Sequence, residues 1–337
     1  MSAGTRSVER GTGEETMTAV VQRGYGPPDV LERQEVERPV PGEGEVLIQV
    51  RAAAANPLDW HFMRGEPYVM RVQSGLRRPK VETRGVDVAG VVETVGAGVT
   101  ALAPGDEVFG WCKGAFAEYA RAGADQFLPK PENLTFEAAA AVPIAALTAL
   151  QGLRDEAEVR AGETVLINGA SGGVGTFAVQ IAKSFGADVT GVCSTRNLEL
   201  VRSLGADHVV DYTETDFARG DRRYDVVFDL VGNRSLSALR RALAPDGRLV
   251  LSGGEGGPWL GPLGLMARAA LANPFTSQRL GSFLSRETRE DLETLADLLG
   301  SGAVTPVVDR TYPLAETAEA IRYLETGRAR GKVVVTP

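Results

Sequence analysis

Cysteine and histidine are scarce in this chain, which has only 2 of each among its 337 residues. Cys112 and Cys193 lie far apart in the sequence, which excludes a disulfide framework and fits a reducing compartment such as the cytoplasm. Two cysteines and two histidines leave few ligands for a transition-metal site. His61 stands alone beside Trp60, so we interpret it as a packing or surface residue and not as a ligand.

Long apolar runs and an excess of positive charge are also missing. No run approaches the roughly 18 residues of a membrane-spanning helix, so we expect no membrane segment. The formal net charge of -8 argues against a nucleic-acid-binding surface. Residues 1–16 have no apolar stripe and are predicted to form a disordered tail without a signal or transit peptide, with Met17 as a candidate alternative start.

The stretch 164–175, TVLINGASGGVG, joins an apolar strand to a helix through a glycine-rich turn. Apolar residues at helical spacing follow in 176–183. Unpaired backbone N–H groups at a helix start bind phosphate, and glycines let the phosphate approach the backbone. The dinucleotide pattern G-x-G-x-x-G has Ala170 at its first position, so the hexapeptide alone also fits an ordinary glycine-rich connection.

Strands and helices alternate after this turn. We expect a helix at about 198–204 and strands at 188–193, 208–210, 225–230 and 248–251. This alternation predicts an α/β fold with a doubly wound parallel sheet, and it favours dinucleotide binding at the glycine-rich turn.

The flanking segments have a different pattern. Residues 18–134 contain short strands such as 45–50 and 86–95, punctuated by glycine and proline, and are predicted to be mostly β. Residues 135–153 have a helical, alanine-rich pattern that Pro143 divides. Two further helices are expected at about 286–299 and 314–324, before a final strand at 332–335.

Over residues 17–337 the chain resembles the medium-chain dehydrogenase/reductase superfamily, in its zinc-independent quinone oxidoreductase branch, which is similar to alkenal and enone reductases. Besides INGASGGVG, the matching segments are YGPPDVLE (25–32), ANPLDW (55–60), GVDVAGVV (85–92), PGDEVFG (104–110), ALTAL (146–150), LGADHVVDY (204–212) and GKVVV (331–335).

The resemblance implies two domains with an active site in the cleft between them. A GroES-like β-barrel substrate domain would comprise residues 17–134 and 305–337, and a Rossmann NADPH-binding domain would comprise residues 135–304. It also implies a homodimer, in which a strand near the end of the Rossmann sheet, such as 249–254, pairs across a two-fold axis; an internal strand would have the same sequence pattern.

The resemblance also predicts that zinc is not used. The Cys-His pair of zinc-dependent relatives falls on Asn56 and Pro57, and their Gly-His-Glu motif falls on 85–87, where the histidine is Val86. Their third ligand falls near Pro143, and a lobe with four cysteines is missing. Since zinc needs three or four N, S or O ligands, these positions cannot supply a zinc site.

The cofactor is predicted to be NADPH. NAD-preferring domains usually carry an acidic residue about 20 positions beyond the glycines, but here the second strand ends in Ser194, Thr195 and Arg196. The Ser194 hydroxyl and the Arg196 guanidinium could hold a 2′-phosphate, although Arg196 also fits a solvated residue at a helix start. The resemblance adds Tyr212 beside the same phosphate, with packing at the adenine edge as the alternative.

A hydride acceptor activated without zinc should be conjugated, because an enolate or hydroquinone spreads the developing charge and a few hydrogen bonds then suffice. We therefore expect a quinone or the C=C bond of an α,β-unsaturated carbonyl. By resemblance Asn56 lies near the nicotinamide or substrate oxygen, where its amide could donate to the enolate; a turn residue before Pro57 is the alternative. The expected site residues are Asn56 as catalytic residue, Thr148, Ala170, Ser171, Gly172, Gly173, Val174, Gly175, Ser194, Arg196, Tyr212, Ser252, Gly253 and Gly254 for the cofactor, and no metal ligand.

Two other functions share these motifs. One is an enoyl reductase within a biosynthetic pathway, which would differ in pocket shape, with the difference expected in residues 256–279. The other is a non-catalytic, NADPH-binding structural or regulatory protein. Tight NADPH binding without reduction of any acceptor would favour the latter.

Overall fold

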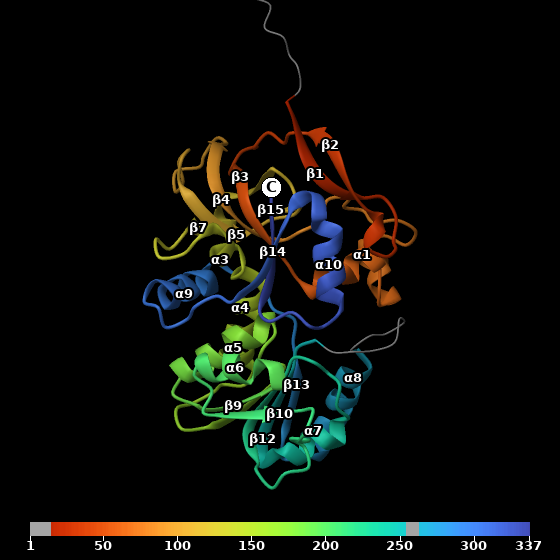
Figure 1. Cartoon of the computed structure of the whole chain (residues 1–337), viewed down its shortest axis with the longest axis vertical. Coiled ribbons are helices and arrows are strands. Elements are labelled where there is room, and N and C mark those ends of the chain that lie inside the picture. The colour runs from red at the N-terminus through yellow and green to blue at the C-terminus, as the bar shows by residue number, and fades with distance from the viewer. Residues whose placement is uncertain (1–14, 254–262) are drawn as a thin grey trace, which may run out of the picture.

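The computed structural model describes residues 15–253 and 263–337 and consists of two domains, each built around its own sheet (Figure 1). The last strand returns to the first domain, so the N-terminal and C-terminal parts of the chain share one sheet. Residues 1–14 of the predicted tail 1–16 and the segment 254–262 lie outside the described residues. The prediction is wrong at the end of the tail, because Thr16 begins β1 and Glu15 forms an ion pair with Arg38.

The second domain contains a six-stranded parallel sheet. Its strands are β8 (Thr164–Asn168), β9 (Asp188–Cys193), β10 (His208–Asp211), β11 (Tyr224–Asp229), β12 (Leu243–Leu251) and β13 (Arg279–Ser282). Their spatial order is β10-β9-β8-β11-β12-β13. This is the Rossmann order 3-2-1-4-5-6, which reverses direction between β8 and β11, where such sheets bind dinucleotides.

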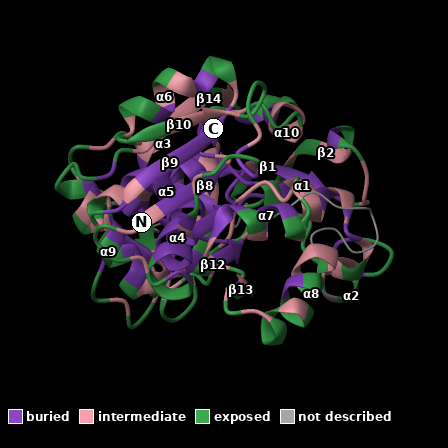
Figure 2. Ribbon diagram, turned by 90° about the horizontal axis from the view of Figure 1, so that it is seen from below, coloured by how far each residue is buried: buried purple, intermediate pink, exposed green. Residues whose placement is uncertain are grey.

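Helices cover both faces of this sheet. They are α4 (Pro143–Gln151), α5 (Gly173–Ser184), α6 (Leu198–Ser203), α7 (Leu236–Ala242), α8 (Leu263–Ala272) and α9 (Arg289–Gly300). Helix α4 is apolar on nearly every side and packs between α5 and α9, which explains why almost all of it is buried (Figure 2).

The first domain is a mostly antiparallel, GroES-like β structure. A seven-stranded sheet consists of β3 (Glu45–Ala55), β4 (Asp87–Val95), β5 (Glu107–Trp111), β6 (Tyr119–Gly123), β7 (Phe127–Pro129), β14 (Val308–Pro313) and β15 (Lys332–Thr336), and a hairpin joins β1 (Thr16–Gln22) and β2 (Leu31–Glu37). Its helices are α1 (Pro57–Arg64), α2 (Arg71–Ser74), α3 (Phe136–Ala140) and α10 (Thr317–Glu325). Glycine and proline lie in the turns between these strands because their backbone angles suit tight turns.

The expected sequence elements agree with these bounds to within a few residues, including the helical break at Pro143 between α3 and α4. One detail differs at the sheet edge. The strand expected at 249–254 overlaps only the end of β12, which stops at Leu251 and pairs with β11 on one side and β13 on the other. Because β12 is internal, it cannot pair across a two-fold axis; among the described strands, the edges of this sheet are β10 and β13.

Candidate active site

The glycine-rich turn between β8 and α5 has the close packing that a dinucleotide site requires. Gly169 has a φ of +90°, the left-handed region that favours glycine, so the tight turn occurs one residue before Ala170. A Cβ at Gly175 would lie 2.1 Å from the carbonyl oxygen of Gly169. Ala170 is fully buried and adopts no left-handed backbone. Alanine is therefore tolerated at the first position of the pattern.

The start of α5 offers a cradle for an anion. Gly172 caps the helix without a side-chain hydrogen bond, and a Cβ there would meet nothing closer than 3.4 Å. The first N–H groups of an α-helix have no intrahelical acceptor, and the N-terminus carries a partial positive charge. A pyrophosphate group fits this turn, because its oxygens can accept from these N–H groups.

Other predicted cofactor residues follow neighbouring parallel strands. Ser194 follows β9, Tyr212 follows β10, and Ser252 and Gly253 follow β12. Because the carboxyl ends of parallel strands meet at one edge of a sheet, these residues share the edge that holds the glycine-rich turn. Gly254 lies outside the described residues.

Asn197 joins two parts of this edge, and the sequence interpretation missed it. Its amide nitrogen donates to the hydroxyl of Ser171 at 2.9 Å and to that of Ser194 at 3.3 Å. Its side-chain oxygen is buried and has no hydrogen-bond partner among the described residues. Since a buried acceptor without a partner is costly, it indicates a place for a donor from a ligand or water.

Arg196 is exposed at this edge and reaches the first domain. Its guanidinium donates to the backbone carbonyl of Arg328 at 2.5 Å, between α10 and β15. The contact places the backbone of Arg328 beside the predicted 2′-phosphate site. No local sequence pattern indicates this contact, because the two residues are 132 positions apart.

Thr148 lies in the buried helix α4 and is 7% exposed. Its hydroxyl donates to the carbonyl oxygen of Ile144 at 2.7 Å and lies 2.9 Å from the hydroxyl of Ser285. The small side chain is thus held in one orientation at the domain boundary.

A buried polar cluster forms where the two domains meet. Lys332, at the start of β15, donates from its ammonium group to Oδ1 of Asn56 at 2.5 Å and to Oδ2 of Asp87 at 3.1 Å. Asn56 in turn donates to Asp87 at 2.9 Å. Their exposed fractions are 3% for Lys332, 4% for Asn56 and 0% for Asp87. We call these three residues the Lys332 cluster.

The Lys332 cluster lies against the glycine-rich turn. The backbone N–H of Gly331 donates to the carbonyl oxygen of Ser171 at 2.9 Å. A Cβ at Gly173 would lie 3.1 Å from Cδ of Lys332. The lysine side chain therefore runs beside the anion cradle before it reaches Asn56 and Asp87.

The positions that correspond to zinc ligands by resemblance do come together here. Asp87 accepts from the backbone N–H of Ile144 at 3.0 Å through its other oxygen, so segments 56, 86–87 and 143–144 meet around one carboxylate. An amide, a lysine ammonium and one carboxylate do not form a zinc ligand set. Within residues 15–253 and 263–337, no group of three or more His, Cys, Asp or Glu residues could hold a metal ion.

Asp59 lies next to this cluster and caps α1. Its carboxylate accepts from the backbone N–H of Asn56 at 2.7 Å, while Asn56 is the N-cap residue. Burial raises the pKa of Asp59 to about 6, with a further increase from Asp87. Burial also raises the pKa of the Cys112 thiol to about 12, so this cysteine stays protonated and unreactive at neutral pH.

His61 packs as expected for a residue without a catalytic role. Its ring stacks on Trp60 with the centroids 3.6 Å apart, and Nδ1 lies 2.8 Å from the carbonyl oxygen of Glu66. Burial lowers the pKa of His61, which keeps it neutral.

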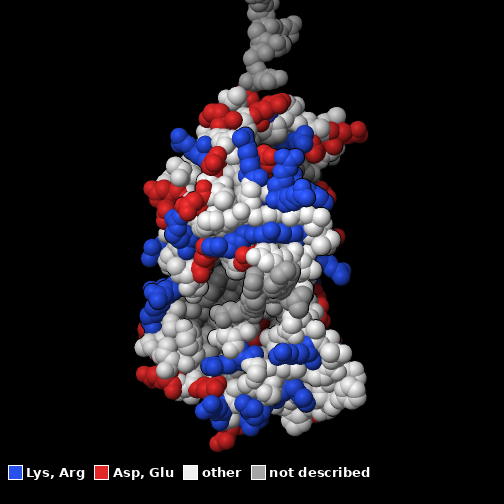
Figure 3. Space-filling view, turned by 90° about the vertical axis from the view of Figure 1, so that its right-hand side faces the viewer, with Lys and Arg blue, Asp and Glu red and all other residues white. Residues whose placement is uncertain are grey.

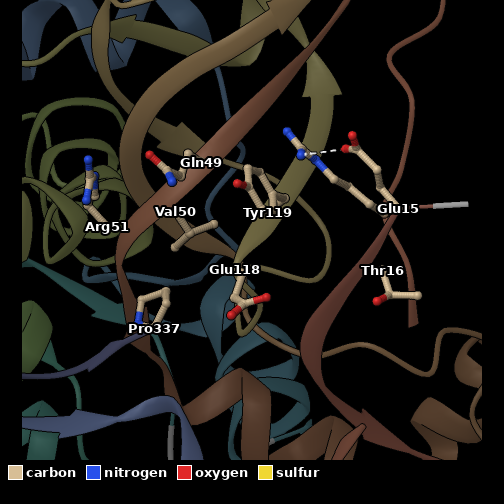
Figure 4. A pocket seen from close by; sticks show the side chains of 9 residues that line it. Glu15, Thr16, Gln49, Val50, Arg51, Glu118, Tyr119 and Pro337 are labelled. Carbon is tan, nitrogen blue, oxygen red and sulfur yellow. Dashed lines mark hydrogen bonds and ion pairs between the residues drawn. The ribbon is translucent and has the colours of Figure 1, made fainter. Parts of the chain in front are cut away.

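A polar cavity of about 560 Å³ lies elsewhere, on the first domain (Figure 4). Its lining residues come from β1, β3, β6 and the C-terminus, and an ion pair joins Arg38 to Glu15 at 2.8 Å on its wall. None of the predicted site residues lines this cavity, so it is separate from the cofactor edge.

Family models match both domains. Residues 42–132 match the alcohol dehydrogenase GroES-like domain, and residues 204–335 match a model described as zinc-binding dehydrogenase. The quinone oxidoreductase of Mus musculus is 34% identical over 342 residues, which cover 96% of this chain and 99% of the relative. The 2-methylene-furan-3-one reductase of Solanum lycopersicum is 36% identical, over 93% of this chain and 77% of that protein.

Solved structures agree with these matches. The quinone oxidoreductase from Coxiella burnetii has a TM-score of 0.84 and 31% identity, and covers 96% of this chain and 100% of its own. A mycobacterial protein solved as a complex with NADPH has a TM-score of 0.80 and 31% identity, over 95% of this chain and 100% of its own. None of the described helices is long and apolar enough to cross a membrane.

Proposed function

This chain belongs to the medium-chain dehydrogenase/reductase family, in the zinc-independent quinone oxidoreductase branch, and on that premise we propose that it transfers hydride from NADPH to a quinone or to the C=C bond of an α,β-unsaturated carbonyl. The relatives named for quinone and enone reduction support the reaction class. The observation that carries the proposal is the position of the Lys332 cluster directly beside the glycine-rich turn.

NADPH would bind at the carboxyl edge of the Rossmann sheet. The turn 170–175 would hold the pyrophosphate, Ser194 and Arg196 the 2′-phosphate, and Tyr212 the adenosine side. Thr148, Ser252 and Gly253 would border the nicotinamide half, together with Gly254. Strand β9 ends in a hydroxyl and a guanidinium and not in a carboxylate, which favours NADPH over NADH, since a 2′-phosphate forms charge-assisted hydrogen bonds there. The Asp211 carboxylate of the neighbouring strand β10 accepts hydrogen bonds from Thr195 and Thr213.

When bound there, NADPH supplies a hydride, and the acceptor takes up that hydride together with a proton. The protein then has to orient the acceptor, exclude bulk water and balance the charge that develops on the acceptor oxygen. No side-chain acid is required for this, because water can supply the proton. A conjugated acceptor needs less charge stabilisation than a simple aldehyde, which fits a site whose ligand positions carry Asn56, Val86 and Pro143.

Asn56, expected from the sequence to be catalytic, is in our proposal a positioning residue. In the structure its amide hydrogens go to Asp87 at 2.9 Å and to the carbonyl of Ala54 at 3.4 Å, and its oxygen accepts from Lys332. A hydrogen bond to an enolate would require one of these bonds to open. We propose that Asn56 acts mainly by holding the Lys332 ammonium beside the cofactor, where a fixed positive charge faces the reacting region.

The proposal is tested with purified protein, NADPH and a panel of quinones and enones. Loss of the reduced-nicotinamide absorbance with at least one acceptor is expected. Tight NADPH binding with no turnover across the panel would contradict the enzyme assignment and favour a binding protein.

We also propose a homodimer in the cytoplasm. The edge strand β13 pairs only with β12 among the described strands, so its other side could pair with a second copy. Both cysteines are buried free thiols, which fits a reducing compartment. Light scattering of the purified protein, with a proline introduced in β13, tests the interface.

A further inference from the structure

A basic pocket lies on the first domain outside the cofactor edge. It has a volume of about 700 Å³ and is lined by Leu76, Arg77, Arg78, Pro79, Lys80 and Glu82. We call residues 76–82 the basic loop. Arg77, Arg78 and Lys80 are exposed, and none of their side chains forms a hydrogen bond or ion pair within residues 15–253 and 263–337.

The backbone of the basic loop is fixed. Gly75 has a φ of +119°, and a Cβ there would lie 2.1 Å from the carbonyl oxygen of Arg78. Lys80 donates its N–H to the carbonyl oxygen of Ser74 at 2.8 Å, and the hydroxyl of Tyr25 donates to the carbonyl of Gly75 at 2.7 Å. The three cations are therefore presented from a turn with a defined shape.

Aromatic stacking strengthens this support from the preceding helix. The guanidinium of Arg71 in α2 lies 4.5 Å from the ring centroid of Tyr25 and 4.6 Å from that of Tyr68. It also donates to the carbonyl oxygen of Gly65 at 2.8 Å. A preorganised group of charges loses less side-chain and loop entropy on binding an anion than a mobile loop would.

The basic loop leads directly to the Lys332 cluster. Lys80 and Asp87 are seven residues apart, so the pocket lies at most about 25 Å from the buried carboxylate along the chain. The segment in between is held by Gln22, whose N–H donates to the carbonyl oxygen of Glu82 at 2.7 Å. The separation is therefore within the span of one extended ligand.

The surroundings also point to the mouth of the interdomain region. Helix α2, which precedes the basic loop, and α8 of the Rossmann domain lie on the same side of the molecule when it is seen from below (Figure 2). Basic side chains gather above a hollow between the two domains on the face turned toward the viewer in Figure 3. Two apolar residues are exposed here: Leu76 in the basic loop is 72% exposed, and Val72 in α2 is 69% exposed.

Charge makes this location distinctive. The whole chain carries a net charge of -8, so its average field repels anions. Three cations, which have no partner among the described residues, and one carboxylate, Glu82, line the pocket. A local excess of positive charge on an acidic protein selects for a ligand with a concentrated negative charge, and guanidinium groups match phosphate oxygens well.

We propose that the basic loop binds a phosphate group, or a comparable multiply charged anion, carried by the acceptor itself. The inference rests on the proposed function and refines it: the acceptor is an unsaturated carbonyl joined through a partly apolar chain of at most about 25 Å to a phosphate-bearing end. Simple quinones lack such an end. This substrate class favours a reductase of phosphate-bearing enoyl compounds over a general quinone reductase.

Binding is tested first, without turnover. Inorganic pyrophosphate is titrated by calorimetry into protein saturated with NADPH, so that the cofactor edge is already filled. The Arg77→Glu/Arg78→Glu variant should bind pyrophosphate at least about tenfold more weakly. The matched control is Arg160→Glu/Arg223→Glu, which reverses two exposed charges that precede β8 and β11. These charges lie at the amino ends of the Rossmann strands, so this variant should bind pyrophosphate as the parent protein does.

Turnover is then compared for one enone and for the same enone with a terminal phosphate. The phosphate-bearing acceptor should have at least about tenfold higher kcat/KM, and only the Arg77→Glu/Arg78→Glu variant should lose this advantage while keeping its rate with the neutral enone. Equal binding and equal kcat/KM ratios in variant and parent would overturn the inference but leave the proposed function intact. If pyrophosphate binding depends on Arg77 and Arg78 but no acceptor is reduced, the proposed function is overturned and the anion site itself is retained.

A phospholipid surface is the other source of phosphate groups. The same proteins are therefore mixed with vesicles of phosphatidylcholine with and without phosphatidylglycerol. Binding to the anionic vesicles that depends on Arg77 and Arg78, together with no calorimetric binding of pyrophosphate, would overturn the acceptor subsite in favour of a membrane contact. No vesicle binding is the expected result.

Discussion

Lys332 donates a hydrogen bond to the side-chain oxygen of Asn56 across 2.5 Å, although the two residues are 276 positions apart in the chain. The bond joins the last strand of the barrel to the start of α1, at a place where zinc-dependent relatives carry a metal ligand. The Lys332 ammonium is also paired with the buried Asp87 carboxylate at 3.1 Å. This relationship gives a direct test of the Lys332 cluster.

Replacing Lys332 by methionine should destabilise the protein. The substitution leaves the fully buried Asp87 carboxylate without its cation, and such a loss typically costs about 3 kcal/mol. Urea unfolding measures the change. Lys332→Met/Asp87→Asn should recover part of it, while Lys113→Met, at an exposed lysine, should change stability by less than about 0.5 kcal/mol. If Lys332→Met lowers the free energy of unfolding by less than about 1 kcal/mol, the proposed pairing of Lys332 with Asp87 is contradicted.

Replacing Arg196 by alanine should weaken NADPH far more than NADH. If its guanidinium holds the 2′-phosphate, the KM for NADPH rises about tenfold or more and the KM for NADH stays within about twofold. Arg223→Ala, before β11, is the control. Equal effects on the two cofactors would remove Arg196 from the phosphate site.

Two glycines of the turn should separate folding from cofactor binding. Gly175→Ala would bring a methyl group 2.1 Å from the carbonyl oxygen of Gly169, so the variant should lose stability. Gly172→Ala has 3.4 Å of space and an ordinary φ of -83°, so it should fold like the parent. Because a methyl group there would enter the anion cradle, its NADPH affinity should fall. Thermal unfolding measures the stability of each variant, and calorimetry measures its NADPH affinity. An unchanged NADPH affinity in Gly172→Ala would place the pyrophosphate elsewhere.

Asp59 should make stability depend on pH. Its carboxyl loses a proton near pH 3.9 in the unfolded chain and near pH 6 in the folded protein, so the folded state binds more protons in this window. The stabilisation is complete below about pH 4 and is lost as the pH rises through about 6. The Asp59→Asn variant keeps an acceptor for the Asn56 N–H.

The measurement is the difference in unfolding free energy between Asp59→Asn and the parent across this range. The difference should shift in favour of the variant by up to about 3 kcal/mol between pH 4 and pH 7, as follows from the pKa of about 6. A constant difference would show that Asp59 titrates alike in both states.

The sequence predicted the periodic parts of the fold and the local part of the site. Apolar runs and the turn 164–175 specify β8 and α5, because strand, turn and helix are encoded by neighbouring residues. Ala170 departs from the G-x-G-x-x-G pattern, but the residue with the left-handed backbone is Gly169, one position earlier. The spacing of glycines alone does not show which position needs that backbone.

Contacts between distant segments could not be predicted in the same way. Lys332 appears in the sequence as the first residue of an ordinary strand, and only the return of β15 to β3 brings it to Asn56. Asn197 and Arg328 are similarly local turn residues whose partners come from other elements. The unpaired charges of the basic loop also depend on which carboxylates lie nearby, which spacing alone does not reveal.

The central claim is hydride transfer from NADPH to a conjugated carbonyl, and isotope labelling tests it most directly. NADPH carrying deuterium on the transferable position of the nicotinamide is incubated with the protein and an enone, and the product is analysed by mass spectrometry and NMR. We predict a saturated carbonyl with one deuterium on its β-carbon, formed in step with NADPH consumption. The account would be contradicted if the protein binds NADPH tightly but leaves every acceptor unreduced, whether or not the acceptor carries a phosphate group.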